Sequence, residues 1–568
     1  VGLEAPVDVG LAGVVDLDDD GVLDLYGLAD GVPARITGQA TRDYHYQVVR
    51  PRAQTAAGDQ RINSFGIGAT VEVRSGLLVQ TQVVTGPVVH VGLGTRRAVD
   101  VTRIVWPNGV PQAEFDPQVD AAITAEQRLK GSCPWVFADN GQGLQFITDF
   151  LWRSPLGLRI NAADTAGVTQ TEDWIRIGGD QLAPRNGVYD VRITAELWET
   201  HYIDHVALMV VDHPADVEVF VDERFVPAAP PALEVHAVRD VTTVADARDH
   251  RGRIVTPMIE SLDGRYLATF ARGPYQGIAE EHWVEFDVPA RPAGAARWWI
   301  VGQGWVYPTD SSINVAIGQG GRVRPQSLAL DVLDDAGRWT TVASDLGFPA
   351  GKNKTVLIDL QPLERAGLPG PRRVRLRTNL EIYWDRLATA VGVDGSVLRT
   401  ERLEPAGAEL RYRGYSATVG SRSEPETPIY DRIASTSPRW RDLVGYYTRF
   451  GDVRELVAGV DDRYVIMNAG DELALTFAAR PGPPDGWTRD FVLIGDGWNK
   501  DGDFNTDYSK TVLPLPAHGT GYTAADDRLS LEADPVYQRH PDDWRTYHTR
   551  YVVPRAFVDG LSRRAASR

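Results

Sequence analysis

Apolar and polar side chains alternate along much of this chain. In residues 189–197 apolar side chains occupy every second position, and polar or charged side chains fill the positions between them. A period of two is typical of a β-strand with one buried face. Residues 206–211 are apolar without interruption, which indicates a strand buried on both faces. These patterns predict an all-β, multidomain protein.

The segment from 231 to 400 is the richest in such strands. Turn residues separate the apolar runs, and strands at this density predict a β-sandwich or jelly roll. The pattern resembles galactose-binding-type modules. The expected strands cover residues 266–270, 283–288, 297–301, 327–333, 339–342, 355–360, 373–378 and 381–384.

Few segments have the period of a helix. The alanine-rich residues 120–130 predict one. A second is expected to begin at Ser437-Pro438, since serine caps and proline starts helices. Asn140-Gly141 predicts a hairpin turn between two short strands. The face of the second helix would carry Trp440, Leu443, Val444 and Tyr447.

Residues 16–24, Asp-Leu-Asp-Asp-Asp-Gly-Val-Leu-Asp, have the pattern of a calcium loop. Alternating carboxylates and a glycine at the bend can surround a hard cation that takes about six to eight oxygens. Short apolar runs flank the loop, so we expect it between strands and not between EF-hand helices. The expected Ca²⁺ ligands are the carboxylates of Asp16, Asp18, Asp20 and Asp24 and the backbone carbonyl of Val22.

This loop resembles the FG-GAP repeat of integrin-type β-propellers. The resemblance implies that residues 1–40 are the remnant of one propeller blade. Because a single blade cannot bury its own apolar surface, we expect further residues before Val1.

Three motifs follow in order along the chain. They are N-x-x-G-x-G-A-x-V-x-V at residues 63–73, H-x-G-L-G at 90–94 and W-P-x-G at 106–109. Together they resemble the ASPIC/UnbV domain, which follows FG-GAP repeats in cartilage acidic protein-like proteins. The resemblance covers about residues 10–115 and implies a small β-domain.

The prolines of residues 227–231 form a stiff linker and mark a further boundary. We therefore expect five segments: the blade remnant at 1–40, the ASPIC/UnbV β-domain at 41–118, a β-rich domain with an acidic and histidine-rich hairpin at 119–230, the β-sandwich at 231–400, and a mixed C-terminal β-rich domain with a short helix at 401–568.

Carboxylates and imidazoles are concentrated between residues 199 and 213. If the strands at 189–197 and 206–211 form a hairpin, these side chains meet at its tip, where they could hold zinc or iron or act in catalysis. The alternative is an ordinary polar hairpin tip. The candidate residues are Glu199, His201, Asp204, His205 and His213.

A second acidic stretch follows the apolar residues 491–494. Asp501, Asp503 and Asn505 alternate as oxygen ligands would, which predicts a weaker second calcium site. The glycine expected after the third ligand is replaced by Thr506, so a solvated acidic turn is the alternative.

Net charge and cysteine content reduce the number of functions that fit the sequence. The net charge of −18 disfavours binding to nucleic acid or to an anionic membrane surface, and fits cation binding. No apolar run reaches the length of about 18 residues that spans a bilayer.

Cys133 is the only cysteine, so no intrachain disulfide can form. It could be a nucleophile, but a buried structural thiol is favoured because no histidine lies near it in sequence.

Two hypotheses about function follow. The first is a calcium-binding adhesion or scaffold protein, extracellular, on the cell surface or periplasmic, that binds a protein or carbohydrate ligand and is part of a larger chain or assembly. The second is a metal-dependent enzyme using the residues between 199 and 213; the UnbV half of the family name comes from enediyne biosynthesis clusters, so the resemblance would place it in secondary metabolism. No complete catalytic motif is present, which favours the first. The aromatic residues that could stack on a sugar or form the sandwich core are Trp298, Trp299, Trp305, Tyr307, Tyr383 and Trp384.

Overall fold

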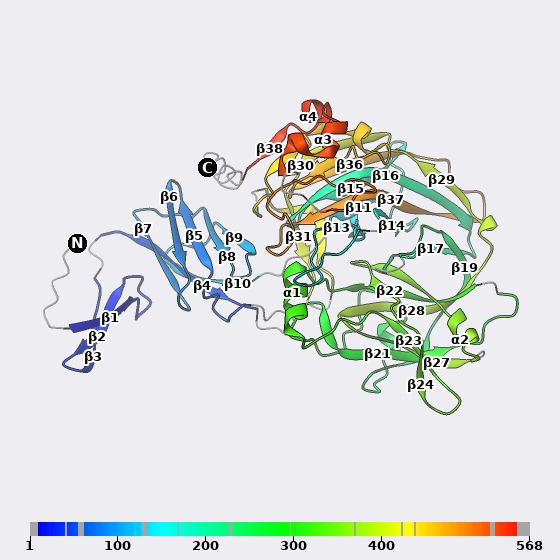
Figure 1. Ribbon diagram of the computed structural model, residues 1–568, viewed down its shortest axis with the longest axis horizontal. Coiled ribbons are helices and arrows are strands. Elements are labelled where there is room, and N and C mark those ends of the chain that lie inside the picture. The colour runs from blue at the N-terminus through cyan, green and yellow to red at the C-terminus, as the bar shows by residue number, and fades with distance from the viewer. Residues whose placement is uncertain are drawn as a thin grey trace. The chain divides into compact units, whose positions relative to one another are not determined.

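The computed structural model describes residues 9–39, 42–54, 62–127, 133–168, 170–226, 230–295, 297–368, 371–421, 424–436, 439–522 and 529–553. Its described residues form two compact units, one up to residue 127 and the other from residue 133. Both are built mainly of β-strands (Figure 1), which confirms the predicted all-β, multidomain class.

The first unit contains three sheets. An antiparallel sheet holds β1 (Val9–Val15), β2 (Asp24–Ala29) and β3 (Val32–Ile36). A second has the order β10-β4-β7, and a third the order β6-β5-β8-β9. Val49, Val71, Val91 and Trp106 are buried between these elements. The strands of the second and third sheets are β4 (His45–Arg52), β5 (Thr70–Ser75), β6 (Leu78–Val83), β7 (Val89–Gly94), β8 (Val101–Val105), β9 (Pro111–Phe115) and β10 (Ala121–Glu126).

The helix predicted at residues 120–130 was wrong over its described part. Residues 121–126 form β10, which pairs in parallel with β4, from Ala121 opposite Gln47 to Glu126 opposite Arg52. Strand pairing overrides the intrinsic helix preference of alanine, because the ladder satisfies the backbone hydrogen-bonding groups and Ala125 becomes buried.

The second unit contains two β-sandwiches, one inserted into the other. The host sandwich has a sheet of order β12-β11-β15-β36-β30-β34 and a sheet of order β13-β37-β16-β29, with β14 and β35 also paired to the latter. Both sheets contribute to one core that includes Val191, Ile203, Leu208 and Leu475. Its strands are β11 (Trp135–Asp139), β12 (Leu144–Asp149), β13 (Pro155–Leu156), β14 (Glu172–Ile177), β15 (Val188–Thr194), β16 (Glu199–Pro214), β29 (Arg399–Leu403), β30 (Gly407–Tyr412), β34 (Gly451–Asp452), β35 (Val465–Met467), β36 (Asp471–Ala478) and β37 (Trp487–Asp501).

This topology corrects the predicted division of the chain. Strands from residues 135–214 and from residues 399–501 share both sheets of the host sandwich. The segments 119–230 and 401–568 are therefore not separate domains over their described residues. Pairing between strands that are distant in sequence does not alter the local pattern of apolar and polar residues, so this pattern could not show that the two segments share their sheets.

The segment 231–400, predicted to be a β-sandwich, contributes most of the inserted sandwich, which begins earlier, at β17 (Glu218–Phe220). Its sheets have the orders β17-β19-β28-β22-β26 and β20-β21-β27-β23-β24. Residues 266–270 do not form the expected strand; Leu267 makes only an isolated bridge to Trp384. The elements are β17 (Glu218–Phe220), β18 (Arg224–Phe225), β19 (His236–Thr243), β20 (Ala245–Asp249), η1 (Thr256–Met258), β21 (Ile278–Val288), β22 (Arg297–Val306), α1 (Ser311–Gly320), β23 (Ala329–Leu333), β24 (Trp339–Ala343), β25 (Phe348–Pro349), β26 (Lys354–Asp359), α2 (Gln361–Arg365), β27 (Arg372–Leu380), β28 (Ile382–Gly392) and η2 (Gly395–Val397).

C-terminal segments cover part of the host sandwich (Figure 1). They pack on the sheet face that carries Tyr202 and Trp498, and form an apolar cluster with Leu515 and Val536. These segments and the neighbouring short elements are β31 (Tyr415–Val419), β32 (Thr427–Ser435), β33 (Gly445–Tyr447), η3 (Arg454–Val457), η5 (Leu531–Ala533), α3 (Pro535–Arg539), α4 (Asp543–Thr546) and β38 (Arg550–Val552). No helix among the described residues is long and apolar enough to cross a membrane.

The helix expected after residue 437 is not formed in residues 439–447, and Ser437 and Pro438 lie outside the described residues. Gly445–Tyr447 instead pairs with Arg550–Val552 as a strand. The indole nitrogen of Trp440 donates to the backbone carbonyl of Glu196 at 3.0 Å. Tyr447 is buried in the apolar cluster that contains Tyr202 and Trp498. Leu443 lies in the same apolar cluster, but Tyr447 reaches it from a strand and not from a helix.

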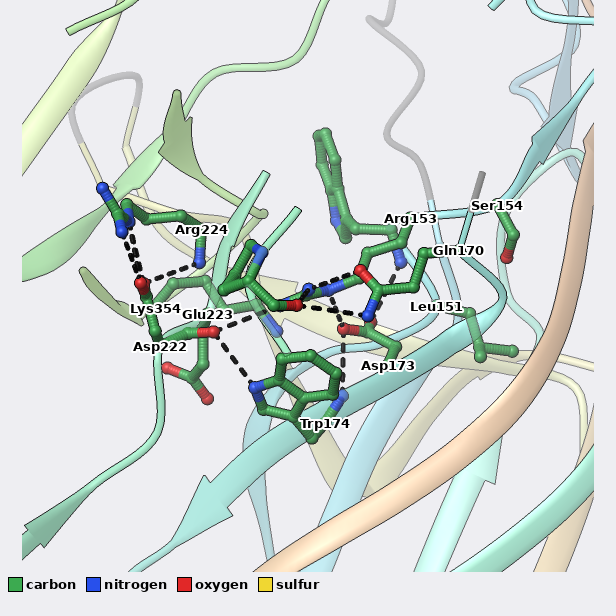
Figure 2. Close-up of polar contacts among 12 residues, drawn as sticks. Leu151, Arg153, Ser154, Gln170, Asp173, Trp174, Asp222, Glu223, Arg224 and Lys354 are labelled. Atoms are coloured by element: carbon green, nitrogen blue, oxygen red, sulfur yellow. Dashed lines mark hydrogen bonds and ion pairs between the residues drawn. The ribbon is translucent and has the colours of Figure 1, made fainter. Parts of the chain in front are cut away.

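A buried polar network joins the host sandwich to the segment that follows β17 in the inserted one (Figure 2). Nε of Arg153 donates to Asp173 at 2.9 Å, and its guanidinium lies 3.9 Å from the ring centre of Trp174. Arg153 and the Trp174 indole also donate to the backbone carbonyl of Asp222, at 3.2 and 3.0 Å. Because breaking a buried ion pair leaves an uncompensated charge, these contacts fix the first strands of the host to the segment after β17.

Candidate functional site

Two clusters of metal-ligating side chains occur among the described residues, one in each unit. Three ligand atoms of Asp16, Asp18 and Asp24 lie within 4.8 Å of one another, and so do three of Asp204, Asp496 and His518. The first cluster belongs to the loop of residues 16–24, here called the Asp16 loop. The second, together with Asp462, is called the His518 cluster.

The Asp16 loop connects β1 and β2, as expected for a loop between strands. Backbone amides hold its carboxylates in place: Gly21 donates to Asp16 at 2.8 Å, and Leu17 and Gly38 donate to Asp24 at 2.9 and 2.8 Å. The bonds from Gly38 and Leu17 lower the pKa of Asp24. The loop thus holds three carboxylates at short distances from one another.

Arg35 occupies the side of the loop next to two of these carboxylates. Its guanidinium pairs with Asp18 and, at 2.9 Å, with Asp24. Asp20 points to its own loop and accepts from the amide of Val22 at 2.8 Å. A cation bound between Asp18 and Asp24 would have to displace Arg35, which neutralises the same charges.

The His518 cluster is built from four distant segments of the second unit. Asp496 lies in β37, Asp462 precedes β35, and His518 lies in the loop that follows β37. Asp204 is the additional residue of a β-bulge in β16, where Ile203 pairs with Gly497 and the next paired residue, His205, is opposite Asp496. A bulge redirects a side chain out of the regular alternation of a strand, and bulges are frequent beside active sites.

Hydrogen bonds connect the members of this cluster through the imidazole. His518 Nδ1 lies 2.7 Å from Asp462 Oδ1, and Nε2 lies 2.8 Å from Asp496 Oδ1. Asp204 Oδ2 accepts from the backbone amide of Asp462 at 3.1 Å and lies 3.6 Å from His518 Nδ1. The outer oxygen of Asp462 accepts from Arg539 at 2.7 Å.

The pKa values in the His518 cluster diverge strongly. Burial opposes charge on His518, but its bonds to Asp462 and Asp496 outweigh burial and raise its pKa to about 10. Burial likewise opposes charge on Asp462, but His518 and Arg539 lower its pKa to about 2. Burial raises the pKa of Asp204 to about 7. Perturbed groups of this kind collect at functional sites, although ion-pair networks perturb pKa values too.

A cavity of about 870 Å³ lies beside the cluster. Its wall includes His518, Thr171, Trp498 and Tyr522. The His518 side chain is 31% exposed, whereas that of Asp204 is fully buried. His518 is therefore the member that a molecule in the cavity can reach.

The hairpin expected to join Glu199, His201, Asp204 and His205 is not formed. Strand β15 pairs with β11 and β36 in one sheet, whereas β16 pairs with β37, β35 and β29 in the other. The candidate residues are positions along the 16-residue strand β16, where successive side chains point to opposite faces. Only Asp204 joins the His518 cluster.

The other candidates have local partners. His201 Nδ1 lies 2.7 Å from Asn499 Oδ1, and burial lowers the pKa of His201 to about 4. Glu199 accepts from the backbone amide of Cys133 at 2.8 Å. His205 lies 3.3 Å from Glu404, and His213 lies 3.4 Å from Asp490. Glu199 Oε2 also lies 3.9 Å from His201 Nδ1, so these two residues stay together. His205 and His213 lie elsewhere along β16 with other partners, so the predicted residues do not form one centre.

Asp501, Asp503 and Asn505 form a turn. The amide of Asp503 donates to Asp501 at 2.8 Å, and the amide of Asn505 donates to Asp503 at 2.8 Å. Asp503 also accepts from the hydroxyl of Ser312 at 2.8 Å, and Asn505 donates to the same hydroxyl at 3.0 Å. The alternating oxygens thus order the turn against the start of α1.

Two further side-chain predictions concern burial. Cys133 is buried, and its sulfur lies 3.6 Å from the amide nitrogen of Asn499. Of the aromatic residues considered for sugar stacking, the buried ones are Trp298, Trp299, Trp305, Tyr383 and Trp384. Their burial favours a role in the core.

Three members of the His518 cluster were not predicted. Asp462 and His518 stand in irregular segments without a metal-binding spacing. Asp496 lies between Gly495 and Gly497, and a Cβ at Gly497 would lie 2.1 Å from the carbonyl oxygen of Tyr202. Two glycines around an acidic residue inside an apolar strand indicate close backbone approach, and were the one local signal.

Part of the chain matches a known protein family. Residues 59–131 match the family described as ASPIC and UnbV, so the chain contains an ASPIC/UnbV domain there. The match includes all three motifs and begins after the Asp16 loop. No curated protein matches the chain.

Proposed function

We propose that this protein binds calcium in the Asp16 loop and acts by binding a partner rather than by catalysis. The observation that carries the proposal is the convergence of Asp16, Asp18 and Asp24 within 4.8 Å on a loop between two strands. Carboxylates and backbone carbonyls are the ligands that Ca²⁺ prefers. The carbonyl of Val22 and a rotated Asp20 side chain would complete the site, as in the FG-GAP repeat that the loop resembles.

In this proposal calcium is structural. An ion bound only by the folded loop stabilises the fold by mass action. It also replaces Arg35 at Asp18 and Asp24, so the loop would exchange one neutralising cation for another. An extracellular, cell-surface or periplasmic location supplies the calcium that such a site needs.

Exposed apolar side chains on the first sheet support a protein partner or a larger assembly. Large apolar residues of β1, β2 and β3 are unusually accessible, and such surface commonly marks an interaction site. A carbohydrate ligand is the other partner class that we expect for an adhesion or scaffold protein. The residues are Leu11 (58% exposed), Val14 (52%), Leu28 (51%) and Val32 (64%).

Calcium binding by the Asp16 loop can be tested by titration calorimetry on the full chain after chelation. The wild type should bind one equivalent at this loop, and Asp16→Asn or Asp18→Asn should lower the affinity at least about tenfold, since each removes a charged ligand. Asp30→Asn, at the exposed β2–β3 turn, is the matched control and should bind as the wild type does. Calcium binding that is equal in Asp16→Asn and the wild type would refute the proposal.

A metal-dependent enzyme is the second candidate function. The cavity of about 870 Å³ beside the His518 cluster favours it, because ligand sites combine a concave surface with a few convergent polar groups. Of the residues first considered for this chemistry, only Asp204 lies there. This function requires a reactive metal or an acid–base pair at the cavity wall.

A further inference from the structure

The His518 cluster contains a buried carboxylate oxygen that the hydrogen bonds of the protein do not satisfy. Asp204 is 0% exposed, and its Oδ1 has no hydrogen-bond partner among the residues that the structure describes. Leaving a buried oxygen of this kind without a hydrogen bond is energetically costly, so its position calls for a ligand. The bulge in β16 turns this carboxylate toward Asp496 and His518.

We propose that Asp204, Asp496 and His518 bind a divalent transition-metal ion that faces the cavity. The ligands are the carboxylates of Asp204 and Asp496 and Nε2 of His518. One carboxylate oxygen each of Asp204 and Asp496 and a ring nitrogen of His518 already lie within 4.8 Å of one another, so side-chain rotations could bring the three ligands around one ion. The proposal does not rest on the Asp16 loop, which lies in the other unit.

Asp462 is a positioning residue in this arrangement. It lies 2.7 Å from Nδ1 of His518 and accepts from the backbone amide of the same residue at 2.9 Å. A carboxylate on the far nitrogen of a metal-binding histidine fixes its tautomer and ring orientation. Arg539, which donates to the other oxygen of Asp462, keeps that carboxylate in place.

The donor set favours zinc or manganese over calcium. Imidazole nitrogen is a good ligand for transition metals, whereas calcium takes oxygen almost exclusively. Three protein ligands with one side open to a cavity are typical of catalytic zinc sites, where water or substrate takes the remaining position. Thr171 is 2.9 Å from Asp496 and lines the same cavity, so its hydroxyl could hold that molecule.

Metal binding should be measured on the full chain after chelation, with Zn²⁺, Mn²⁺ and Ca²⁺ in separate calorimetric titrations and with elemental analysis after dialysis. We expect one equivalent of Zn²⁺ or Mn²⁺ in the wild type. Asp496→Asn and His518→Gln should lower its affinity more than about 100-fold, and Asp462→Asn about 10- to 100-fold. His540→Gln changes a C-terminal histidine outside the cluster and should have no effect.

A loop variant distinguishes this proposal from the proposed function. Asp16→Asn should lose calcium and keep the transition metal, whereas His518→Gln should show the reverse. The inference is overturned if the wild type binds no transition metal, or if its binding is unchanged in both Asp496→Asn and His518→Gln.

A measurement on the wild type avoids variants that fail to fold. With Fe²⁺ bound and ascorbate and peroxide added, oxidation should concentrate near the ion and be found by peptide mass spectrometry at His518 and the neighbouring residues of β16 and β37. Oxidation confined to other regions would exclude the site. If the His518 cluster is only an ion-pair network and binds no metal, oxidation will be confined to other regions.

Discussion

The Asp16 loop and the His518 cluster use the same chemical groups but are assembled in different ways. The loop takes its carboxylates from nine consecutive residues, and Asp16 and Asp18 lie near the surface. The cluster takes four residues from segments between 204 and 518 and buries three of them. A cation at the loop would replace solvent and Arg35, whereas at the cluster it would replace protons and buried ion pairs. The two sites therefore differ more in the burial of their side chains than in the types of residue that form them.

The largest predicted difference concerns stability. Asp462→Ala removes the partner of His518 and Arg539 and should lower the free energy of unfolding of the second unit by about 3 kcal/mol. The loss is large because Asp462 is buried and accepts several hydrogen bonds. Denaturant unfolding followed by tryptophan fluorescence measures it.

The matching change in the loop is Asp18→Ala. Its ion pair with Arg35 is exposed to solvent, and such pairs contribute little. We expect Asp18→Ala to lower the free energy of unfolding of the first unit, in which the loop lies, by less than about 1 kcal/mol. Equal losses of stability in Asp462→Ala and Asp18→Ala would mean that burial does not explain the difference between the two sites.

The next largest effect is a pH dependence that arises in β16. The pKa of His201 is lowered by burial to about 4 in the folded protein, against about 6.5 when unfolded. The unfolded state therefore binds this proton first, and stability is lost as pH falls from about 6.5 to about 4. By linkage the loss approaches about 3 kcal/mol, and His201→Gln should remove it. Urea unfolding of both proteins at several pH values measures the difference.

His213, at the other end of the same strand, provides a control of opposite sign. Burial opposes its charge, but the hydrogen bond with Asp490 outweighs burial and raises the pKa. Its contribution is complete below the unfolded pKa and is lost as pH rises through the folded value. The deficit of His213→Gln should therefore shrink as pH rises. Parallel pH profiles for the two variants would mean that the hydrogen bond with Asp490 does not outweigh burial at His213.

The smallest predicted effect sharpens the description of the loop. Arg35→Gln removes the cation that competes for Asp18 and Asp24. Because exposed ion pairs are weak, calcium affinity should rise only about two- to fivefold. Calorimetry with Arg50→Gln as control measures this, since Arg50 pairs with Asp19 at 3.2 Å, outside the cluster. A fall in affinity would show that Arg35 orders the loop instead of competing.

The same contrast explains what could be predicted from the sequence. The Asp16 loop and the ASPIC/UnbV motifs are local patterns, and the alternation in residues 189–197 predicted the strand β15. Asp204 was singled out, but its partners Asp462, Asp496 and His518 meet it only through strand pairing and a bulge. Neither the bulge nor the union of residues 135–214 with 399–501 changes the local periodicity. The helix expected at 120–130 failed for the same reason, since a parallel neighbour determined its conformation.

The insertion of one sandwich into the other has a consequence for synthesis on the ribosome. Strand β16 pairs with β37 from Glu199 opposite Asp501 to Pro214 opposite Trp487, so its longest partner emerges roughly 300 residues later. At translation rates of about 5–20 residues per second, the apolar strand waits for about 15 to 60 seconds. The inserted sandwich, whose strands are contiguous in sequence, can fold during that delay. We expect nascent chains that stop before β37 to hold a folded insert beside an open host sheet, which is a natural target for chaperones.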